Sequence, residues 1–385
     1  MATDSKQLVV LGIGGAGGRV VNRIAELATD RAYRLVALDT DAEALAALAV
    51  DERVQAGAGA SCAGDSALGR EGVVEVTASL DALINHAQAV ILVGGLGGGC
   101  CSGAMPAVME HASKASVPVF AIASLPFSFE GGDTVQRAAQ CEAALHKAKA
   151  PLLTLRNDML TEYAGGDRPF AEALAAATDT LATGVRALVD SLTAEQLLPT
   201  STAHLARIAT AADGTEGRMG VGQADGDGAL DRAVKEFCAS PLLGADDPLA
   251  RARAAMVMVV IDETNTQKEI RYALGALVDH LPDSCATAVG IQRRPGKQKT
   301  TIVGLLWLAR EKEPPKKTTK TRTKKTKPST QGELFGDMDG KQGLLPLQEQ
   351  DRGIFSDGMP TKNRTGQDLD IPTFQRQGIH IDKGD

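Results

Sequence analysis

The chain has 385 residues, of which 43% are hydrophobic, so it has room for two domains of ordinary size and a tail. Its formal net charge of −7 argues against a general nucleic-acid binder. Eight Phe, three Tyr and one Trp offer few platforms for stacking on single strands, so we expect no specific nucleic-acid partner.

The cysteines and histidines exclude two further classes of protein. The six cysteines contain no CxxC spacing and no pattern of a disulfide-stapled scaffold, and no histidine stands at metal-ligand spacing to a cysteine or another histidine. No apolar run approaches the roughly 20 residues of a membrane span, and the N-terminal MATDSKQ lacks a signal-peptide pattern. We therefore expect a cytoplasmic protein without direct membrane insertion and without a directly bound metal.

The chain opens with a strand, a glycine turn and a helix. The apolar run Leu8–Leu11 is followed by GIGGAGG at Gly12–Gly18 and then by apolar residues at helical spacing. A second strand, Leu35–Leu38, ends at Asp39. The G-x-G-x-x-G spacing with an acid about 20 residues further on is the dinucleotide fingerprint, so a nicotinamide or flavin enzyme stays open at this point.

A second glycine stretch is the most informative part of the chain. Five glycines lie within Gly94–Gly99, after the apolar run Ala89–Val93 and before AMPAVMEHASKA, which predicts a helix over Ala104–Ala115. Glycine has no side chain to bury in a core, and it loses the most backbone entropy on folding. Five glycines so close together therefore indicate that the backbone closely approaches a ligand. A strand, a glycine turn and a helix N-terminus favour an anion, and we predict a phosphate site.

The first 160 residues alternate strands and helices, which is typical of a parallel sheet covered on both faces. Residues 51–72 read as a long loop with a short helix. The remaining elements of this part are expected at Val117–Ala123 (strand), Asp133–Lys149 (helix) and Pro151–Leu155 (strand).

One long helix is predicted at 170–192, with a stripe of Leu and Val on one face and a high alanine content. We place a first domain at 1–169, this central helix at 170–192 and a smaller α+β domain at 193–310. The second domain has elements expected at Leu230–Ser240 and Gln267–His280 (helices), and at Ala255–Ile261, Ala286–Gln292 and Thr300–Ala309 (strands).

The composition changes at Glu311. Eight Lys or Arg lie between Lys312 and Lys327 with almost nothing apolar, which predicts a disordered basic linker at 311–366. The linker is either a solvated spacer or a weak contact for anionic lipid or nucleic acid. The apolar and charged end of the chain, DLDIPTFQRQGIHIDKGD, predicts a docking peptide at 367–385.

Taken together, these segments resemble the tubulin/FtsZ superfamily, and within it the FtsZ family of bacterial cell-division proteins. The resemblance covers nearly the whole chain and rests on GIGGAGGRVVNRI, DTDAEAL, GAGA, GGLGGGCCSGAMP, PFSFEG, NDML, SPLL and DLDIPTF. The second glycine loop also disfavours the dinucleotide enzyme, which has no use for it. The resemblance implies a parallel-sheet GTP-binding domain joined by the central helix to an activation domain, and head-to-tail polymerisation into filaments for cell division.

The resemblance also implies which residues bind GTP or GDP, with Mg²⁺ carried by the nucleotide. Gly97–Gly99 with Ser102 would hold the β- and γ-phosphates, Glu130 would meet the ribose and Asn157 the guanine edge. The full set is Gly14, Gly15, Ala16, Gly17, Gly18, Arg19, Asp41, Gly97, Gly98, Gly99, Cys101, Ser102, Gly103, Glu130, Thr134, Asn157 and Thr178.

Several of these positions depart from the family pattern. Cys100-Cys101-Ser102 stands where the family has Thr-Gly-Thr, so a glycine has gained a side chain. Arg19 replaces a small polar residue and Thr134 an arginine. Leu174 stands where an aromatic packs on the base, and Thr178 where Asp or Asn reads guanine.

The loop after the central helix departs most. The family carries there an asparagine and two aspartates that complete hydrolysis on the neighbouring subunit, and aligned backward from MGVG these places fall on Pro199, Ser201 and His204. No carboxylate lies between Glu195 and Asp213. Loss of a positioned base costs about 10²–10⁴-fold in rate, so we assign no catalytic residue and expect weakened or absent self-activated hydrolysis.

Two kinds of role follow from this pattern. The first is a filament-forming nucleotide binder, as a homopolymer or in a mixed filament with an intact FtsZ paralogue, docked at the division site on a membrane-tethering protein through Asp368–Gly378. The second is a paralogue that has lost the nucleotide or its hydrolysis and regulates an intact FtsZ.

Overall fold

The computed structural model describes residues 7–310, apart from short gaps at 29–30, 149–150, 164, 166, 194–195, 245–246, 262–264 and 294–298. By its contacts the chain divides into two units, 1–316 and 317–385. The linker predicted at 311–366 and the docking peptide predicted at 367–385 lie outside the described residues.

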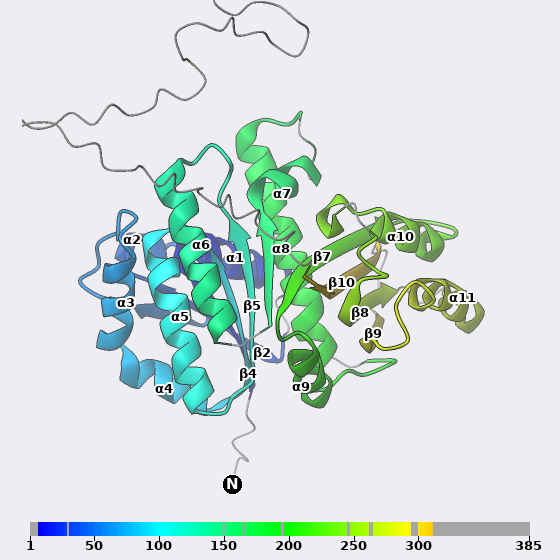
Figure 1. The fold of residues 1–385 in the computed structure, drawn as a ribbon, viewed down its shortest axis with the longest axis horizontal. Coiled ribbons are helices and arrows are strands. Elements are labelled where there is room, and N and C mark those ends of the chain that lie inside the picture. The colour runs from blue at the N-terminus through cyan, green and yellow to red at the C-terminus, as the bar shows by residue number, and fades with distance from the viewer. Residues whose placement is uncertain are drawn as a thin grey trace, which may run out of the picture. The chain divides into compact units, whose positions relative to one another are not determined.

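One ten-stranded sheet runs through the described residues in the order β3-β2-β1-β4-β5-β6-β7-β10-β8-β9 (Figure 1). Its first six strands are parallel. They are β1 (Gln7–Ile13), β2 (Tyr33–Asp39), β3 (Glu52–Gln55), β4 (Ala87–Gly95), β5 (Val119–Leu125) and β6 (Leu152–Arg156). β1 is central, with Leu11 paired to Val36 on one side and to Leu92 on the other. The predicted α/β class with a parallel sheet is confirmed.

Side chains of β1 alternate between two hydrophobic cores, because successive residues of a strand point to opposite faces. Leu8 and Val10 pack with apolar residues of α1 (Gly14–Leu27) and α8 (Phe170–Thr193). Val9, Leu11 and Ile13 join the core formed with four helices on the other face (Figure 1). These are α3 (Ser66–Glu75), α4 (Thr77–Asn85), α5 (Gly99–Lys114) and α6 (Gly132–Lys147).

The predicted central helix is confirmed as α8, which has 24 residues and runs one residue past the predicted end. Leu181, Val185 and Leu188 are buried along its length. A Cβ at Gly184 would lie 2.2 Å from the sulfur of Met219, so the glycine lets β7 approach the helix closely. No helix among the described residues is long and apolar enough to cross a membrane.

The second half of the sheet is mixed. β10 (Thr300–Ala309) pairs antiparallel with β7 (Thr215–Ala224) and β8 (Ala252–Ile261), and β8 pairs parallel with β9 (Ala286–Arg293). The helical segments of this half are α9 (Thr202–Ala211), α10 (Ala229–Cys238), the 3₁₀ turn η1 (Pro241–Leu243) and α11 (Gln267–Val278). A single pair, Leu153 with Gly217, joins β6 to β7 and so connects the two halves.

Several elements were not predicted from the sequence. The segment 51–72, expected to be a loop with a short helix, contains β3 and begins α3, and α4, α9 and β7 were also missed. β7 was not recognised in the sequence because three of its ten residues are glycine, which is depleted in strands. In the structure these glycines leave room for the Phe237 side chain to pack on the strand. Cβ atoms at Gly220 and Gly222 would lie 2.7 Å and 2.9 Å from atoms of that side chain.

The junction between β6 and β7 gives a stability prediction. A Cβ at Gly217 would lie 2.1 Å from the carbonyl oxygen of Leu152, which is backbone and cannot rotate away. We therefore expect Gly217→Ala to lower the free energy of unfolding by about 1–3 kcal/mol, measured by urea denaturation. Gly275→Ala is the matched control, because it lies within α11 with no atom within 4 Å of the new methyl, and it should be neutral or stabilising. Equal unfolding midpoints for both variants would contradict the junction's importance.

Candidate functional site

A cavity of about 430 Å³ lies at the carboxyl ends of β1, β2, β4 and β5, where open parallel sheets bind their ligands. Its walls come from the start of α1, the turn after β2, the loop 61–64, the start of α5 and the turn after β5. Asn157, at the start of α7 (Asn157–Tyr163), and Leu174 of α8 complete it. The volume lies within the range of small-molecule pockets.

Two helix N-termini meet at this cavity. A Cβ at Gly14 would lie 3.3 Å from the backbone nitrogen of Cys101, so the first turns of α1 and α5 are in contact. Neither N-cap, Ile13 or Gly98, supplies a side-chain cap, and neither helix has an acid in its first turn. The first N–H groups of a helix lack intrahelical partners and carry partial positive charge, so the two ends together favour an anion.

The glycine loop, residues Gly94–Gly99, is held by its surroundings. Gly97 has a φ of +99° and its N–H donates to Oγ of the buried Ser102 at 2.8 Å. A Cβ at Gly97 would lie 2.8 Å from the methyl of Thr134. Only glycine fits both the backbone conformation and this contact. The Ser102 hydroxyl therefore supports the loop and does not line the cavity.

The predicted nucleotide residues divide into two groups. Those that line the cavity are Gly14, Gly15, Ala16, Arg19, Asp41, Gly98, Gly99, Cys101, Glu130 and Asn157. Those that lie outside its wall are Gly17, Gly18, Gly97, Ser102, Gly103, Thr134 and Thr178. The cavity thus brings together residues of five separate predicted segments.

Three of the outlying glycines allow close packing of helices. A Cβ at Gly17 would lie 2.3 Å from the carbonyl oxygen of Val93, and one at Gly103 would lie 2.0 Å from that of Ser66. At Gly18 a Cβ would lie 3.0 Å from the side chain of Leu48. These glycines let α1 pack closely against β4 and α5 pack closely against α3. This packing fixes the positions of the two helix N-termini at the cavity.

The opposite end of the cavity is more apolar. Phe127 is buried and stacks on Phe129 with ring centroids 4.9 Å apart, and Phe170 lies 5.5 Å from Phe127. The Phe127 N–H donates to Oε1 of Glu130 at 2.8 Å, which holds that carboxylate at the cavity rim. The half-buried Asn157 side chain also lines this end, where its amide can both donate and accept.

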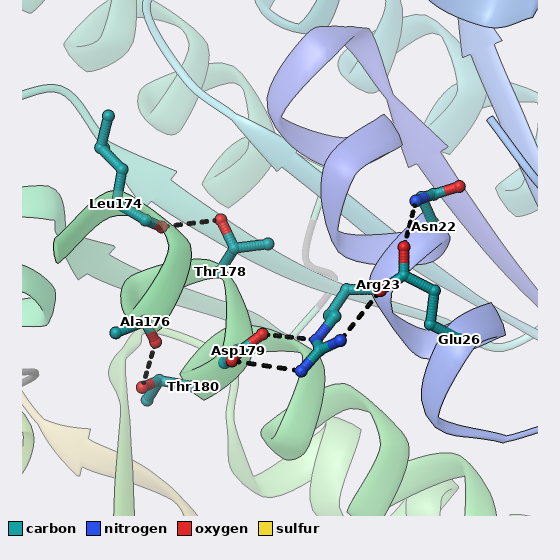
Figure 2. Close-up of polar contacts among 8 residues, drawn as sticks. All are labelled: Asn22, Arg23, Glu26, Leu174, Ala176, Thr178, Asp179 and Thr180. Carbon is teal, nitrogen blue, oxygen red and sulfur yellow. Dashed lines mark hydrogen bonds and ion pairs between the residues drawn. The ribbon is translucent and has the colours of Figure 1, made fainter. Parts of the chain in front are cut away.

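The polar side chains in the first half of α8 form hydrogen bonds within the helix and with α1 (Figure 2). The Thr178 hydroxyl donates to the carbonyl of Leu174 at 2.9 Å, one turn earlier in the helix. Nε of Arg23 donates to Asp179 at 2.6 Å, and Arg23 also pairs with Glu26 at 2.9 Å. The hydrogen bond with Glu26, and next the one with Asp179, raise the pKa of Arg23.

Sequence reasoning did not single out several lining residues, including Thr40, Cys62 and Phe127, as site residues, and it noted Asp39 only as the acid of the dinucleotide fingerprint. Asp39 is buried at the end of β2, and its Oδ1 accepts from the Thr40 N–H at 2.7 Å. Asp39 and Thr40 lie at the end of a buried strand, and this position was the available sequence signal, because such turns line the ligand edge of a parallel sheet. Among the described residues no group of three or more His, Cys, Asp or Glu is placed to hold a metal.

The two cysteines at the start of α5 are buried. The Sγ atom of Cys101 lies 2.3 Å from where a Cβ of Gly94 would be, so this side chain fills the space that Gly94 leaves open. Burial raises the pKa of both the Cys100 and Cys101 thiols well above the ordinary value of 9.0, and Asp39 adds to the shift at Cys100. Both side chains are therefore neutral thiols that serve packing.

Ser201 and His204 form a capping box at the start of α9. The Ser201 N–H donates to Nδ1 of His204 at 3.1 Å, and the Ser201 side chain caps the helix in return. The preceding Thr200 donates to the carbonyl of Ser191 at 2.5 Å, near the end of α8. Leu174 and Ser191 are 17 residues apart on α8, about 25 Å along its axis, so the capping box lies far from its own chain's cavity.

Comparison with known proteins agrees with this geometry. Residues 7–165 match the model of the Tubulin/FtsZ family, GTPase domain. Cell division protein FtsZ 1 of Pyrococcus abyssi is 27% identical over 304 residues, which cover 77% of this chain and 79% of that protein.

Solved structures share the fold. The empty FtsZ dimer of M. jannaschii is similar with a TM-score of 0.72 and 24% identity, over 78% of this chain and 88% of that chain. CetZ2 from Haloferax volcanii, solved as a GTPγS-bound protofilament, has a TM-score of 0.62 and 21% identity, over 78% and 92%.

The buried thiols give a testable outcome. Cys62, Cys100, Cys101 and Cys141 are buried, and burial raises the pKa of Cys141 to about 12. We expect a thiol reagent such as DTNB at pH 8 to label only Cys238 and Cys285 in the native protein, and all six cysteines after unfolding in urea. Because the folded-state pKa values of Cys100, Cys101 and Cys141 lie above 9.0, the unfolded state loses these protons first as the pH rises, and stability should fall above pH 9. Rapid labelling of more than two thiols in the native protein would contradict this site structure.

Proposed function

Because the chain belongs to the tubulin/FtsZ superfamily, we propose that its cavity binds a guanine nucleotide. The observation that carries the proposal is the meeting of two helix N-termini without side-chain caps, a built site for a phosphate chain. A structural relative, CetZ1 from Haloferax volcanii, was solved with GDP bound.

The lining residues suit the parts of such a nucleotide. N–H groups of Gly14–Ala16 and of Gly98–Gly99 would face the phosphates, and Arg19, an exposed cation at the rim, adds positive charge. Glu130 would accept from the ribose hydroxyls and Asn157 would hydrogen-bond the guanine edge. Mg²⁺, when bound with the nucleotide, would neutralise charge on the phosphates.

The same proposal includes filaments with slow hydrolysis. Ser201 and His204 lie about 25 Å along α8 from their own cavity, so this loop can act only on the site of another subunit. There it would present a capping box without a carboxylate where the family presents carboxylates. We propose a homopolymer, or a mixed filament with an intact FtsZ paralogue, in the cytoplasm at the division site. A membrane-tethering partner would bind Asp368–Gly378.

A second candidate function is a regulator that has lost the nucleotide. The observation that favours it lies on α8, where the Thr178 hydroxyl donates within the helix and the Asp179 carboxylate is paired with Arg23 (Figure 2). Neither residue lines the cavity, so neither is placed to read a base there.

The deciding experiment is isothermal titration with GTP, GDP and ATP, with analysis of any nucleotide retained through purification. We expect micromolar or tighter binding of GTP and GDP, with ATP clearly weaker. Absence of binding for all three nucleotides would overturn the proposal in favour of the nucleotide-free regulator.

The hydrolysis part has its own test in the double variant Ser201→Asp/His204→Asp. Asp is a good N-cap and is favourable in the first helical turn, so α9 should still form. Restoring carboxylates should raise phosphate release from GTP by about 10²-fold or more, steeply with protein concentration, while sedimentation of filaments persists. Thr202→Asp adds a charge to the same turn and serves as the control. Brisk release by the unmodified chain would show that another acid reaches the neighbouring site.

A further inference from the structure

Arg137 of α6 contacts the glycine loop from outside the cavity. Its Nε donates to the carbonyl oxygen of Gly97 at 2.9 Å, and Nη2 donates to Oγ1 of Thr134 at 3.3 Å. The same Nη2 lies 3.2 Å from where a Cβ of Gly64 would be. The half-buried guanidinium therefore sits between the loop 61–64 and the glycine loop, both of which form walls of the cavity.

The contact with Gly97 determines where the next N–H points. A trans peptide is planar, so the N–H of Gly98 is directed opposite to the carbonyl of Gly97. Arg137 holds that carbonyl away from the cavity, and Gly98 itself lines the cavity. Within the described residues the Gly98 N–H has no hydrogen-bond partner, so it is free to donate to a ligand.

Two side chains fix this stretch of backbone from both ends. Ser102 Oγ accepts the N–H of Gly97 at 2.8 Å, while Arg137 donates to the carbonyl of the same residue. Without these two hydrogen bonds the Gly97–Gly98 backbone would be free to change conformation, because glycine adopts positive and negative φ about equally well. A rotation of the Gly97–Gly98 peptide would turn a carbonyl oxygen toward the cavity and remove one donor from it.

We propose that Arg137 is a positioning residue that keeps the Gly98 N–H directed at the phosphate groups of the bound nucleotide. This inference rests on the proposed nucleotide binding. Arg137 acts through the backbone, so its removal affects the part of the ligand that carries phosphate and spares the nucleoside. It stands one helical turn after Thr134, where the resemblance to the family placed an arginine.

The test compares Arg137→Met, which keeps an unbranched side chain without a donor, with Arg137→Lys, which keeps the positive charge and N–H donors but loses the planar guanidinium. Full-length protein is titrated with GTP and with guanosine. Loss of one charge-assisted hydrogen bond should weaken GTP binding roughly tenfold or more in Arg137→Met, with guanosine changed less than twofold. Arg137→Lys should recover part of the GTP affinity. Gln136→Ala, an exposed neighbour on α6, is the control and should match the unmodified protein.

A crystal structure of Arg137→Met without nucleotide gives a second readout, in which the Gly97 carbonyl should be rotated or in two orientations. Equal losses for GTP and guanosine, or no loss in a protein that binds GTP, would overturn the role of Arg137. Failure of the unmodified protein to bind GTP would overturn the proposed function instead, and an unchanged Gly97 carbonyl in the variant would then overturn the positioning role by itself.

Discussion

The structure depends on the contact between the first turns of α1 and α5. α1 starts directly after β1 and α5 follows β4 after three intervening residues, and these central, buried strands are neighbours in the sheet. Two helix ends of like polarity are thereby brought together, and their partial positive charges repel each other unless an anion or water lies between them. The sheet and the buried helix faces hold this arrangement in place, because neither helix can withdraw without exposing a large apolar surface.

Glycines make the contact sterically possible. Gly17 lies against the backbone of β4 and Gly103 against that of α3, where any side chain would collide with a carbonyl oxygen. Close packing also requires a glycine opposite Cys101, since the sulfur of Cys101 occupies the space that a side chain at position 94 would need. A side chain gained at one position is accommodated because another residue of the same loop has none.

The sequence was sufficient for the fold class and for the general place of the site. Continuous apolar strands followed by glycine turns predicted a parallel sheet with an anion at its carboxyl edge, and α8 was predicted to within one residue. The role of each glycine was not predictable, because spacing alone does not distinguish Gly98, which lines the cavity, from Gly17 or Gly103, which serve packing. Arg137 was missed for a related reason: its contact with Gly97 joins segments 40 residues apart and exists only once α6 has packed on the loop.

Binding and hydrolysis make different physical demands on such a chain. Binding a phosphate chain relies on backbone N–H groups, which survive almost any substitution that leaves the helix starts in place. Hydrolysis relies on individual side chains placed on a water molecule, so it is lost when one or two residues change. In this chain the backbone donors at α1 and α5 are intact in arrangement, whereas the start of α9 carries a Ser201–His204 pair that satisfies the helix end without a carboxylate. The first demand therefore falls on the backbone at the starts of α1 and α5, whereas the second would fall on individual side chains.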